Sequence, residues 1–175
     1  MYDTLSPLQR HHCMSSIRSV STKPEVKLRH GLWRRGFRYK KNDKSLPGTP
    51  DVVLPKYKSV VFIHGCFWHG HLGCKKYVVP KSNTEFWIEK VSKNKQRDEN
   101  VWRQLEAKGW SVIVVWECEI EKRNFSETLD RVENEIIANG ELHRNRQQER
   151  RMIRELRLAE RRAQKEKYAA LKTEL

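Results

Sequence analysis

The stretch that decides the fold runs from SVVFI at residues 59–63 to SVIVVW at residues 111–116. Both runs are short and rich in β-branched side chains, which is typical of buried strands. Between them, apolar side chains recur at helical spacing from Thr84 until Gly109. Strand, helix and strand in this order predict a right-handed parallel crossover, because parallel neighbours need a long connection. The predicted fold class is therefore α/β.

Shorter signals on either side of this unit predict the remaining elements of one domain over residues 21–140. They are, in chain order, a helix from Ser21 or Thr22 to Gly36, a turn at LPGTP (46–50), a strand over 51–54, and a helix over about 127–138 followed by Asn139-Gly140. Residues 1–20 form an irregular N-terminal arm.

The segment 141–175 differs in composition from the rest of the chain. It is dense in Arg, Lys, Glu and Gln and contains no Pro or Gly. Met152, Leu156, Ala159 and Ala163 recur at helical spacing, so a long exposed basic helix is predicted. That helix can dock on the domain, pair with another chain, lie against a phosphate backbone, or stay solvated with one weakly apolar stripe.

The charge balance indicates the class of partner. The chain of 175 residues has 36 Lys and Arg against 22 Asp and Glu, a net charge of +14 at pH 7. A polyanion is the natural partner of such a chain, and the simpler alternative is a soluble basic protein. No signal peptide opens the sequence and no apolar run approaches the roughly 20 residues of a membrane span. A cytoplasmic protein without membrane contact is therefore expected.

Histidines and cysteines crowd the stretch HGCFWHGHLGC, which follows the first strand of the crossover. The candidate metal ligands are Cys66, His71 and Cys74 in this stretch and Cys118 after the second strand. A parallel crossover brings the ends of its strands side by side, so Cys118 is expected to approach the other three. Thiolates with an imidazole suit tetrahedral Zn²⁺, and four protein ligands make a closed structural site. Two alternatives are open: His69 in place of His71, and buried cysteines that bind no metal.

A second constellation joins acidic and histidine side chains at one edge of the sheet. Asp51 follows Pro50 at the start of a strand, His64 ends the next strand, and Glu25 lies in the first turn of a helix. Carboxylates placed in this way can hold Mg²⁺ against a phosphate, and a histidine can act on the attacking water. Each residue also has a simpler explanation: Asp51 as a turn former, His64 as a hydrogen-bonded strand end, Glu25 as a favourable helix N-terminal charge. Their common position beside a basic surface favours phosphodiester cleavage.

Four segments of the chain resemble the very short patch repair (Vsr) DNA mismatch endonucleases, both in motif and in order. The likeness covers roughly residues 10–138, and the segments are SLPGTPDVV (45–53), VVFIHGCFWHGH (60–71), TEFWIEKVSKNKQRD (84–98) and GWSVIVVWEC (109–118). The resemblance implies a restriction-endonuclease-like three-layer α/β/α fold with a central mixed sheet. It also implies Mg²⁺-dependent nicking of one DNA strand 5′ to the thymine of a T:G mismatch, the product of 5-methylcytosine deamination. A monomer is expected on the DNA, with mismatch-repair proteins and a repair polymerase as candidate partners.

The same resemblance implies roles for the residues of the site. Asp51 and the backbone carbonyl of Ile63 are expected to bind Mg²⁺. His69 is expected to act on the attacking water, with His64 as a second catalytic histidine. Glu25 matches an acidic helix residue of the family's site.

The zinc ligands implied by the resemblance are the three cysteines and His71 named above. Phe67 and Trp68 match aromatic residues that enter the DNA stack beside the mismatch, and Met14 approaches from the N-terminal arm. An apolar wedge unstacks a base step, and a weakened wobble pair lowers the energy of that deformation.

The chain departs from the family pattern in three places. Ile63 stands where some members have a hydroxyl residue, and the loop between His71 and Cys74 has one extra residue. Phe62-Ile63-His64 replaces the Glu-x-Lys of the wider nuclease fold, so histidine chemistry must substitute for lysine. Two other interpretations stay open: a related nuclease that cuts different DNA, and a zinc-bound DNA-binding module without catalysis.

Overall fold

The computed structural model describes residues 6, 8, 9, 12, 21–121 and 125–173. Met14, a predicted DNA contact, lies outside the described residues. The elements are α2 (Lys23–Arg34), β1 (Lys40–Lys41), β2 (Val52–Leu54), the 3-10 helix η1 (Pro55–Tyr57), β3 (Ser59–His64), α3 (Thr84–Ala107), β4 (Ser111–Trp116), α4 (Glu117–Glu121) and α5 (Phe125–Thr173).

The strands form one mixed sheet in the order β1-β2-β3-β4. β1 pairs antiparallel with β2 and β2 antiparallel with β3, whereas β3 and β4 are parallel. Ser59 pairs with Ser111 and His64 with Trp116, so β3 and β4 end at the same edge of the sheet. Because α3 joins these two parallel strands, the predicted crossover, the mixed sheet and the α/β class are confirmed.

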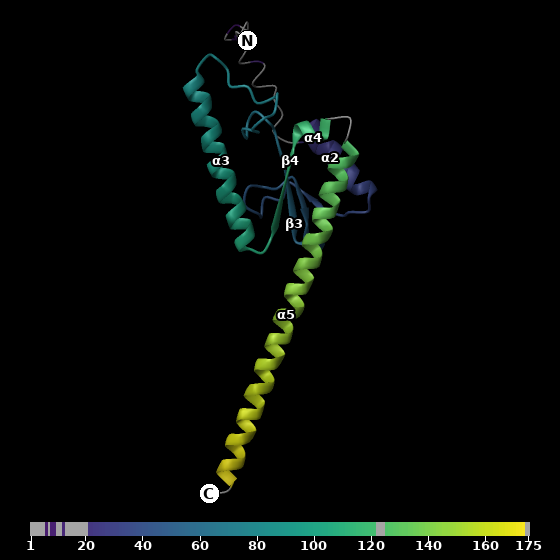
Figure 1. Ribbon diagram of the computed structural model, residues 1–175, viewed down its shortest axis with the longest axis vertical. Coiled ribbons are helices and arrows are strands. Elements are labelled where there is room, and N and C mark those ends of the chain that lie inside the picture. Colours follow the sequence, from purple (N-terminus) through teal and green to yellow (C-terminus); the bar gives the residue numbers. More distant parts are fainter. Residues whose placement is uncertain (1–5, 7, 10–11, 13–20, 122–124, 174–175) are drawn as a thin grey trace.

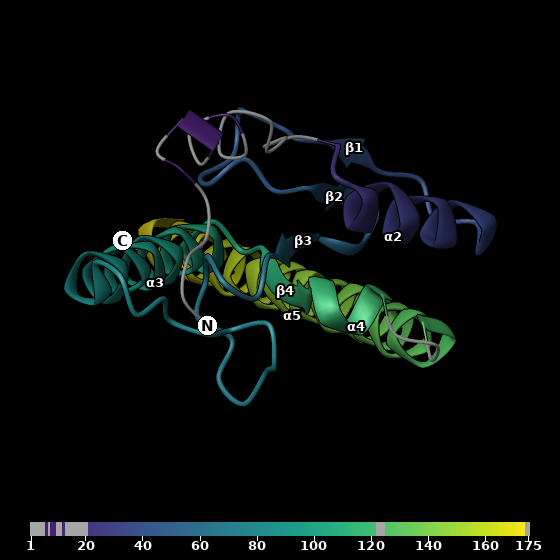
Figure 2. The same ribbon diagram turned by 90° about the horizontal axis from the view of Figure 1, so that it is seen from above.

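Helices cover both faces of this sheet. Alternate strand residues point to opposite faces, so each face has its own apolar core. Val61 and Ile113 pack with Leu28 of α2 and with α4 and α5 on one face. On the other face, Val60 packs with Leu105 of α3. Figure 1 and the view from above in Figure 2 show α3 on one side of the strands and α2 and α4 on the other.

The two helices predicted over about 127–138 and within 141–175 form one continuous helix. A helix ending near residue 138 was expected, but α5 continues without a break from Phe125 to Thr173. Gly140 stays helical because it lies against η1: a Cβ there would meet Tyr57 Cδ1 at 2.8 Å. The glycine therefore permits close packing and does not end the helix. Neither α5 nor any other helix in the described part of the chain is long and apolar enough to cross a membrane.

Candidate active site and metal cluster

The geometry of the sheet brings Asp51 to the end of β3. Asp51 immediately precedes β2, which runs antiparallel to β3 with Val52 opposite Val61. The carboxylate Oδ2 of Asp51 accepts a hydrogen bond of 2.7 Å from the backbone N–H of Ile63. Asp51 therefore lies beside Ile63 and one residue from His64, as the sequence predicted from their neighbouring strands.

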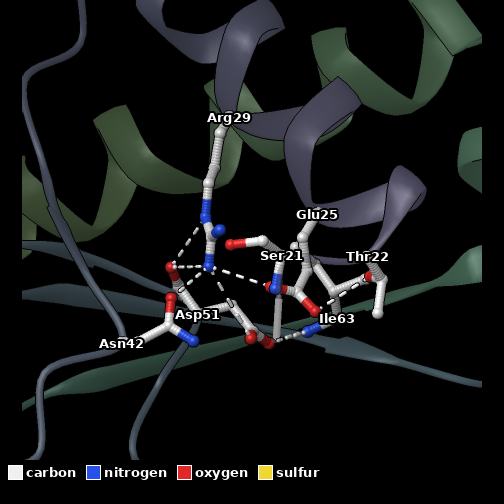
Figure 3. A network of polar contacts seen from close by, with 7 residues as sticks. All are labelled: Ser21, Thr22, Glu25, Arg29, Asn42, Asp51 and Ile63. Atoms are coloured by element: carbon white, nitrogen blue, oxygen red, sulfur yellow. Dashed lines mark hydrogen bonds and ion pairs between the residues drawn. The ribbon is translucent and has the colours of Figure 1, made fainter. Parts of the chain in front are cut away.

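A buried arginine of α2 ties this edge to the first helix. Figure 3 shows the Arg29 side chain reaching from α2 between Glu25 and Asp51. Arg29 donates to the backbone carbonyl of Asp51 from Nε at 3.2 Å and from Nη2 at 2.9 Å. Its Nη2 also lies 3.1 Å from Glu25 Oε2 and hydrogen-bonds Asn42 Oδ1. Arg29 was not among the residues predicted from the sequence, because an arginine in an amphipathic helix is usually solvated.

Glu25 is buried and both of its carboxylate oxygens have partners. Oε1 accepts a hydrogen bond of 2.8 Å from Thr22 Oγ1, and Oε2 accepts one of 3.0 Å from the backbone N–H of Ser21. With Arg29 on Oε2 as well, Glu25 fixes the start of α2 and orients the guanidinium. Glu25 therefore affects Asp51 in two ways: it orients Arg29, and its negative charge raises the pKa of Asp51.

The surroundings of Asp51 oppose its ionisation. Burial and, to a lesser extent, the negative charge of Glu25 raise the pKa of Asp51, while the Ile63 N–H, Arg29 and His69 lower it. The net result is a pKa of about 6. Arg29 offsets the effect of burial only in part, because its Nη2 lies 4.0 Å from Asp51 Oδ1, beyond hydrogen-bond distance. Asp51 is thus a carboxylate whose negative charge is incompletely compensated by the protein.

Two histidines and an aspartate meet on the α3 side of the same edge. The rings of His64 and His69 are stacked, with centroids 3.7 Å apart and planes 14° apart. Nδ1 of His69 lies 2.5 Å from Oδ2 of Asp98 in α3. Burial, followed by the charge of His69, lowers the pKa of His64 to about 3, so His64 is neutral at pH 7. Although burial alone would raise the pKa of Asp98, the hydrogen bond and charge of His69 bring it below the ordinary value.

Asp98 was not among the residues singled out from the sequence, although a signal was present. The buried residues of α3 are Val91, Asp98 and Leu105, at intervals of seven. Asp98 therefore occupies a core-facing position, where an unpaired carboxylate is unfavourable. A charged residue in register with an apolar stripe indicates a buried partner.

Most of these groups, though not Arg29, line one cavity of about 470 Å³ between α2, the strand ends and α3, which we call the Asp51 cleft. Its lining includes all four predicted catalytic residues together with Asp98. The lining is Glu25, Asn42, Gly48, Thr49, Asp51, Phe62, Ile63, His64, His69, Arg97, Asp98, Val101 and Trp102. Two histidines and the carboxylates of Glu25, Asp51 and Asp98 thus face a common space.

The three cysteines and His71 form a second cluster beside the cleft. One ligand atom from each of Cys66, His71, Cys74 and Cys118 lies within 4.8 Å of the others. Nδ1 of His71 lies 3.5 Å from both Cys66 Sγ and Cys118 Sγ. His69 points instead to Asp98, so the structure places His71 with the cysteines.

The chemistry of this cluster favours a bound cation. Burial raises the pKa of Cys66 to about 12, so its thiolate form needs a compensating charge. By contrast, a backbone hydrogen bond from Lys76 leads the effects that lower the pKa of the half-buried Cys74 thiol. His71 is held by stacking on Trp116, with centroids 4.1 Å apart and planes 4° apart.

The predicted intercalating aromatics belong to a larger aromatic group. Phe67 and Trp68 are half-buried, and each contacts Trp87 of α3, with ring centroids 5.2 Å and 6.1 Å apart. Asn94 Nδ2 donates a hydrogen bond of 2.8 Å to the carbonyl of Trp68. The loop therefore presents these rings from a platform fixed to α3.

Comparison with known proteins identifies similar chains. The family profile described as DNA mismatch endonuclease Vsr matches residues 2–76. The type II nicking enzyme V.NmeAIP of Neisseria meningitidis is 52% identical over 137 residues, which is 78% of this chain and 97% of that relative. The type II nicking enzyme V.XorIIP of Xanthomonas oryzae is 46% identical over 120 residues, 69% of this chain and 88% of the relative. The DNA mismatch endonuclease Vsr of Escherichia coli is 38% identical over 143 residues, 80% of this chain and 91% of that protein.

Proposed function

The chain belongs to the Vsr family of DNA mismatch endonucleases, and from this premise and the Asp51 cleft we propose that it nicks one DNA strand 5′ to the thymine of a T:G mismatch, with Mg²⁺ as cofactor. Such a nick begins the restoration of a C:G pair after deamination of 5-methylcytosine. The observation that carries the proposal is the meeting of Asp51 with the His69–Asp98 pair in one cavity. A restriction-endonuclease-like fold is part of the proposal, supported by the mixed sheet with helices on both faces.

The residues around Asp51 fit a hard divalent cation. Its raised pKa indicates a carboxylate that lacks a counter-charge, and oxygen ligands are those that Mg²⁺ prefers. Asp51 and the backbone carbonyl of Ile63 would hold the ion. Bound there, Mg²⁺ would neutralise negative charge developing on the phosphate and the leaving oxygen.

His69 is suited to accept a proton from water. The pKa of Asp98 lies below its ordinary value, so its carboxylate is ionised and accepts a hydrogen bond from Nδ1–H of His69. With the proton on Nδ1, the lone pair of Nε2 is available to the water that attacks the phosphate. His64 remains neutral and stacks on His69, which holds the ring without adding a competing positive charge.

The cysteine cluster fits a structural Zn²⁺. Tetrahedral Zn²⁺ with sulfur and nitrogen ligands separates its ligand atoms by roughly 3.5–3.8 Å. Nδ1 of His71 lies 3.5 Å from two of the sulfur atoms. Four protein ligands leave no open position, so the ion would support the loop and take no part in the reaction.

The aromatic platform, formed by Phe67, Trp68 and Trp87, supports recognition of a deformed base step in DNA. Phe67 and Trp68 lie between the candidate zinc ligands Cys66 and His71 and directly precede His69, which lines the Asp51 cleft. Wedges inserted into the stack would therefore place a phosphate near the cleft. Stacked aromatic wedges favour DNA steps that unstack easily, as a T:G wobble does.

A nicking assay tests this function. Duplexes with one T:G pair in randomised flanks and matched T:A duplexes are incubated with the parent protein and with Asp51→Ala, with Mg²⁺ or with chelator. We expect a nick only at T:G, only with Mg²⁺ and only by the parent protein. Cleavage of matched DNA would instead indicate a relative with another target. Binding without any cleavage would indicate a DNA-binding module.

A further inference from the structure

The part of α5 beyond Gly140 divides its charges between two faces. With about 100° of rotation per residue, every arginine and lysine from Arg144 to Lys165 falls within an arc of roughly 160°. None of the glutamates between Glu141 and Lys165 falls within that arc. These glutamates, together with Met152 and Leu156, lie on the rest of the helix surface. We call the side that holds the cations the α5 basic face.

The side chains of the basic face are free to meet a partner. Residues 144–165 are exposed throughout. Among the described residues of this segment, the ion pair found is Arg151 with Glu155, at 3.8 Å between largely exposed side chains. A pair of this kind contributes little to stability, so the cations are not used to hold the fold together.

The length and charge density of the face suit a DNA duplex. From Arg144 to Lys165 the helix rises roughly 32 Å, because each residue adds about 1.5 Å. The nine cations of the face therefore recur on average about every 3.9 Å along the axis. Phosphates of one strand of B-DNA recur about every 3.4 Å along its axis. Because a DNA strand winds once around the duplex over about this length, a straight helix meets only the phosphates on the side that faces it, and the face offers cations for these.

The face lies away from the Asp51 cleft. Gly140 packs on Tyr57, just before β3 begins, whereas the cleft lies where β3 ends. Beyond that point α5 projects past the rest of the molecule, as Figure 1 shows. A duplex on this face would therefore be held apart from the phosphate that is cleaved.

We propose that the α5 basic face is a second DNA-binding surface, which holds the phosphates of matched duplex DNA without reading sequence. The choice of DNA among polyanions rests on the proposed function, since the chain belongs to a family of DNA endonucleases. Phosphate contacts of this kind raise affinity for any sequence and weaken steeply with salt. The surface would keep the enzyme on DNA between mismatches.

The test compares two full-length variants altered at the same three arginines. In the neutral variant, Arg151→Gln, Arg157→Gln and Arg162→Gln remove charge from the face. In the exchanged variant, each arginine swaps places with an apolar neighbour: Arg151→Met with Met152→Arg, Arg157→Leu with Leu156→Arg, and Arg162→Ala with Ala163→Arg. The exchanged variant keeps the composition and net charge and moves three charges to the opposite side. Circular dichroism checks that both variants remain helical.

Binding of a matched 40-base-pair duplex is measured by fluorescence anisotropy from 50 to 300 mM salt. We expect both variants to bind at least about tenfold more weakly at 0.1 M salt, with the slope of log K against log salt less steep by about 2.7 for three lost phosphate contacts. Nicking of a short T:G duplex at saturating enzyme should stay within twofold of the parent. That result separates this proposal from the proposed function, which would fail in the nicking assay instead.

Three outcomes would overturn the proposal. Parent-like binding by the neutral variant would show that the face does not contact DNA. Parent-like binding by the exchanged variant alone would show that net charge, and not the face, determines affinity. Tighter binding of the parent to vesicles containing 30% phosphatidylserine than to the duplex, lost in both variants, would assign the face to an anionic membrane surface.

Discussion

At the scale of single residues, Asp51 combines a proposed catalytic role with an unfavourable environment. Its pKa of about 6 exceeds the ordinary 3.8, so the folded state binds its proton more tightly than the unfolded state does. Stability is therefore lost as pH rises from about 4 through 6. Above that window the full penalty is about 3 kcal/mol at most, since one pKa unit corresponds to about 1.4 kcal/mol.

We therefore expect Asp51→Asn to abolish nicking and to stabilise the metal-free protein. An asparagine oxygen can still accept the hydrogen bond from Ile63, without the buried charge. Urea denaturation at pH 8 should give an unfolding free energy higher by about 2 kcal/mol, and the gain should shrink at pH 5. Mg²⁺ should stabilise the parent and not the variant. A variant less stable than the parent at pH 8 would show that the Asp51 carboxylate contributes favourable contacts instead.

The His69–Asp98 pair leads to a second prediction at this scale. Asp98→Asn keeps the size of the side chain and loses the charge that favours a proton on Nδ1 of His69. Nicking at saturating Mg²⁺ should fall by about 10²–10⁴, the usual contribution of a positioned general base. The affinity for a T:G duplex should change less than threefold, since the pair does not form the aromatic platform. A parallel loss of binding and nicking would mean that Asp98 acts only in folding.

At the scale of elements, a local helix-breaking signal was outweighed by packing. Gly140 predicted a helix end, because glycine lowers helix propensity, yet α5 continues through it against Tyr57. The β1 strand was missed for a related reason: Lys40 and Lys41 have exposed side chains, and their backbone pairing with β2 leaves no apolar pattern to detect. In contrast, β3, β4 and α3 were predicted with nearly their observed bounds. Burial on both faces of a sheet leaves a continuous apolar run, which is visible in a single sequence.

Gly140 supplies the prediction at this scale. In an exposed helix, replacing glycine by alanine stabilises by up to about 1 kcal/mol. Here the new Cβ would meet the Tyr57 ring at 2.8 Å, and that ring is itself packed on Phe37. We expect Gly140→Ala to lower the unfolding free energy by about 1 kcal/mol, because overpacking outweighs the gain in propensity. The exposed Asn134→Ala, in the same helix, is the control and should be neutral or slightly stabilising. A more stable Gly140→Ala would show that η1 yields without strain.

At the scale of the whole molecule, the chain topology explains which contacts of the site could be predicted from the sequence. Asp51 and His64 lie near the ends of adjacent strands, so their meeting followed from the predicted topology. The pairing of His69 with Asp98 and of Arg29 with Asp51 joins residues far apart in the chain, and depends on how α3 and α2 are docked. A single sequence shows which side of each helix is apolar. It does not show how the helix is rotated against the sheet, and that rotation decides which polar residue meets which partner. The roles of the site residues came from resemblance, and their contacts from the structure.

The metal cluster joins segments that the chain keeps far apart. Cys66 follows β3 and Cys118 lies in α4 after β4, so one ion would connect the ends of both parallel strands. Between β3 and α3, residues 65–83 contain no helix or strand, and their backbone hydrogen bonds close only local turns. A Zn²⁺ ion there would stabilise the loop that presents both His69 and the aromatic platform. Its removal should therefore affect the molecule as a whole.

We expect His71→Ala to lose zinc and His69→Ala to retain one zinc per chain, measured by atomic absorption on purified protein. Loss of the ion should lower the melting temperature by on the order of 10 °C, since structural zinc contributes several kcal/mol and each kcal/mol is worth about 2–4 °C at this size. His71→Ala should also lose nicking because the loop is no longer held. His69→Ala should lose nicking while it retains zinc, with a smaller fall in melting temperature, because Asp98 loses its hydrogen-bond partner. Retention of zinc by His71→Ala would contradict the ligand assignment. Equal melting temperatures with and without zinc would show that the sheet and helices hold the loop by themselves.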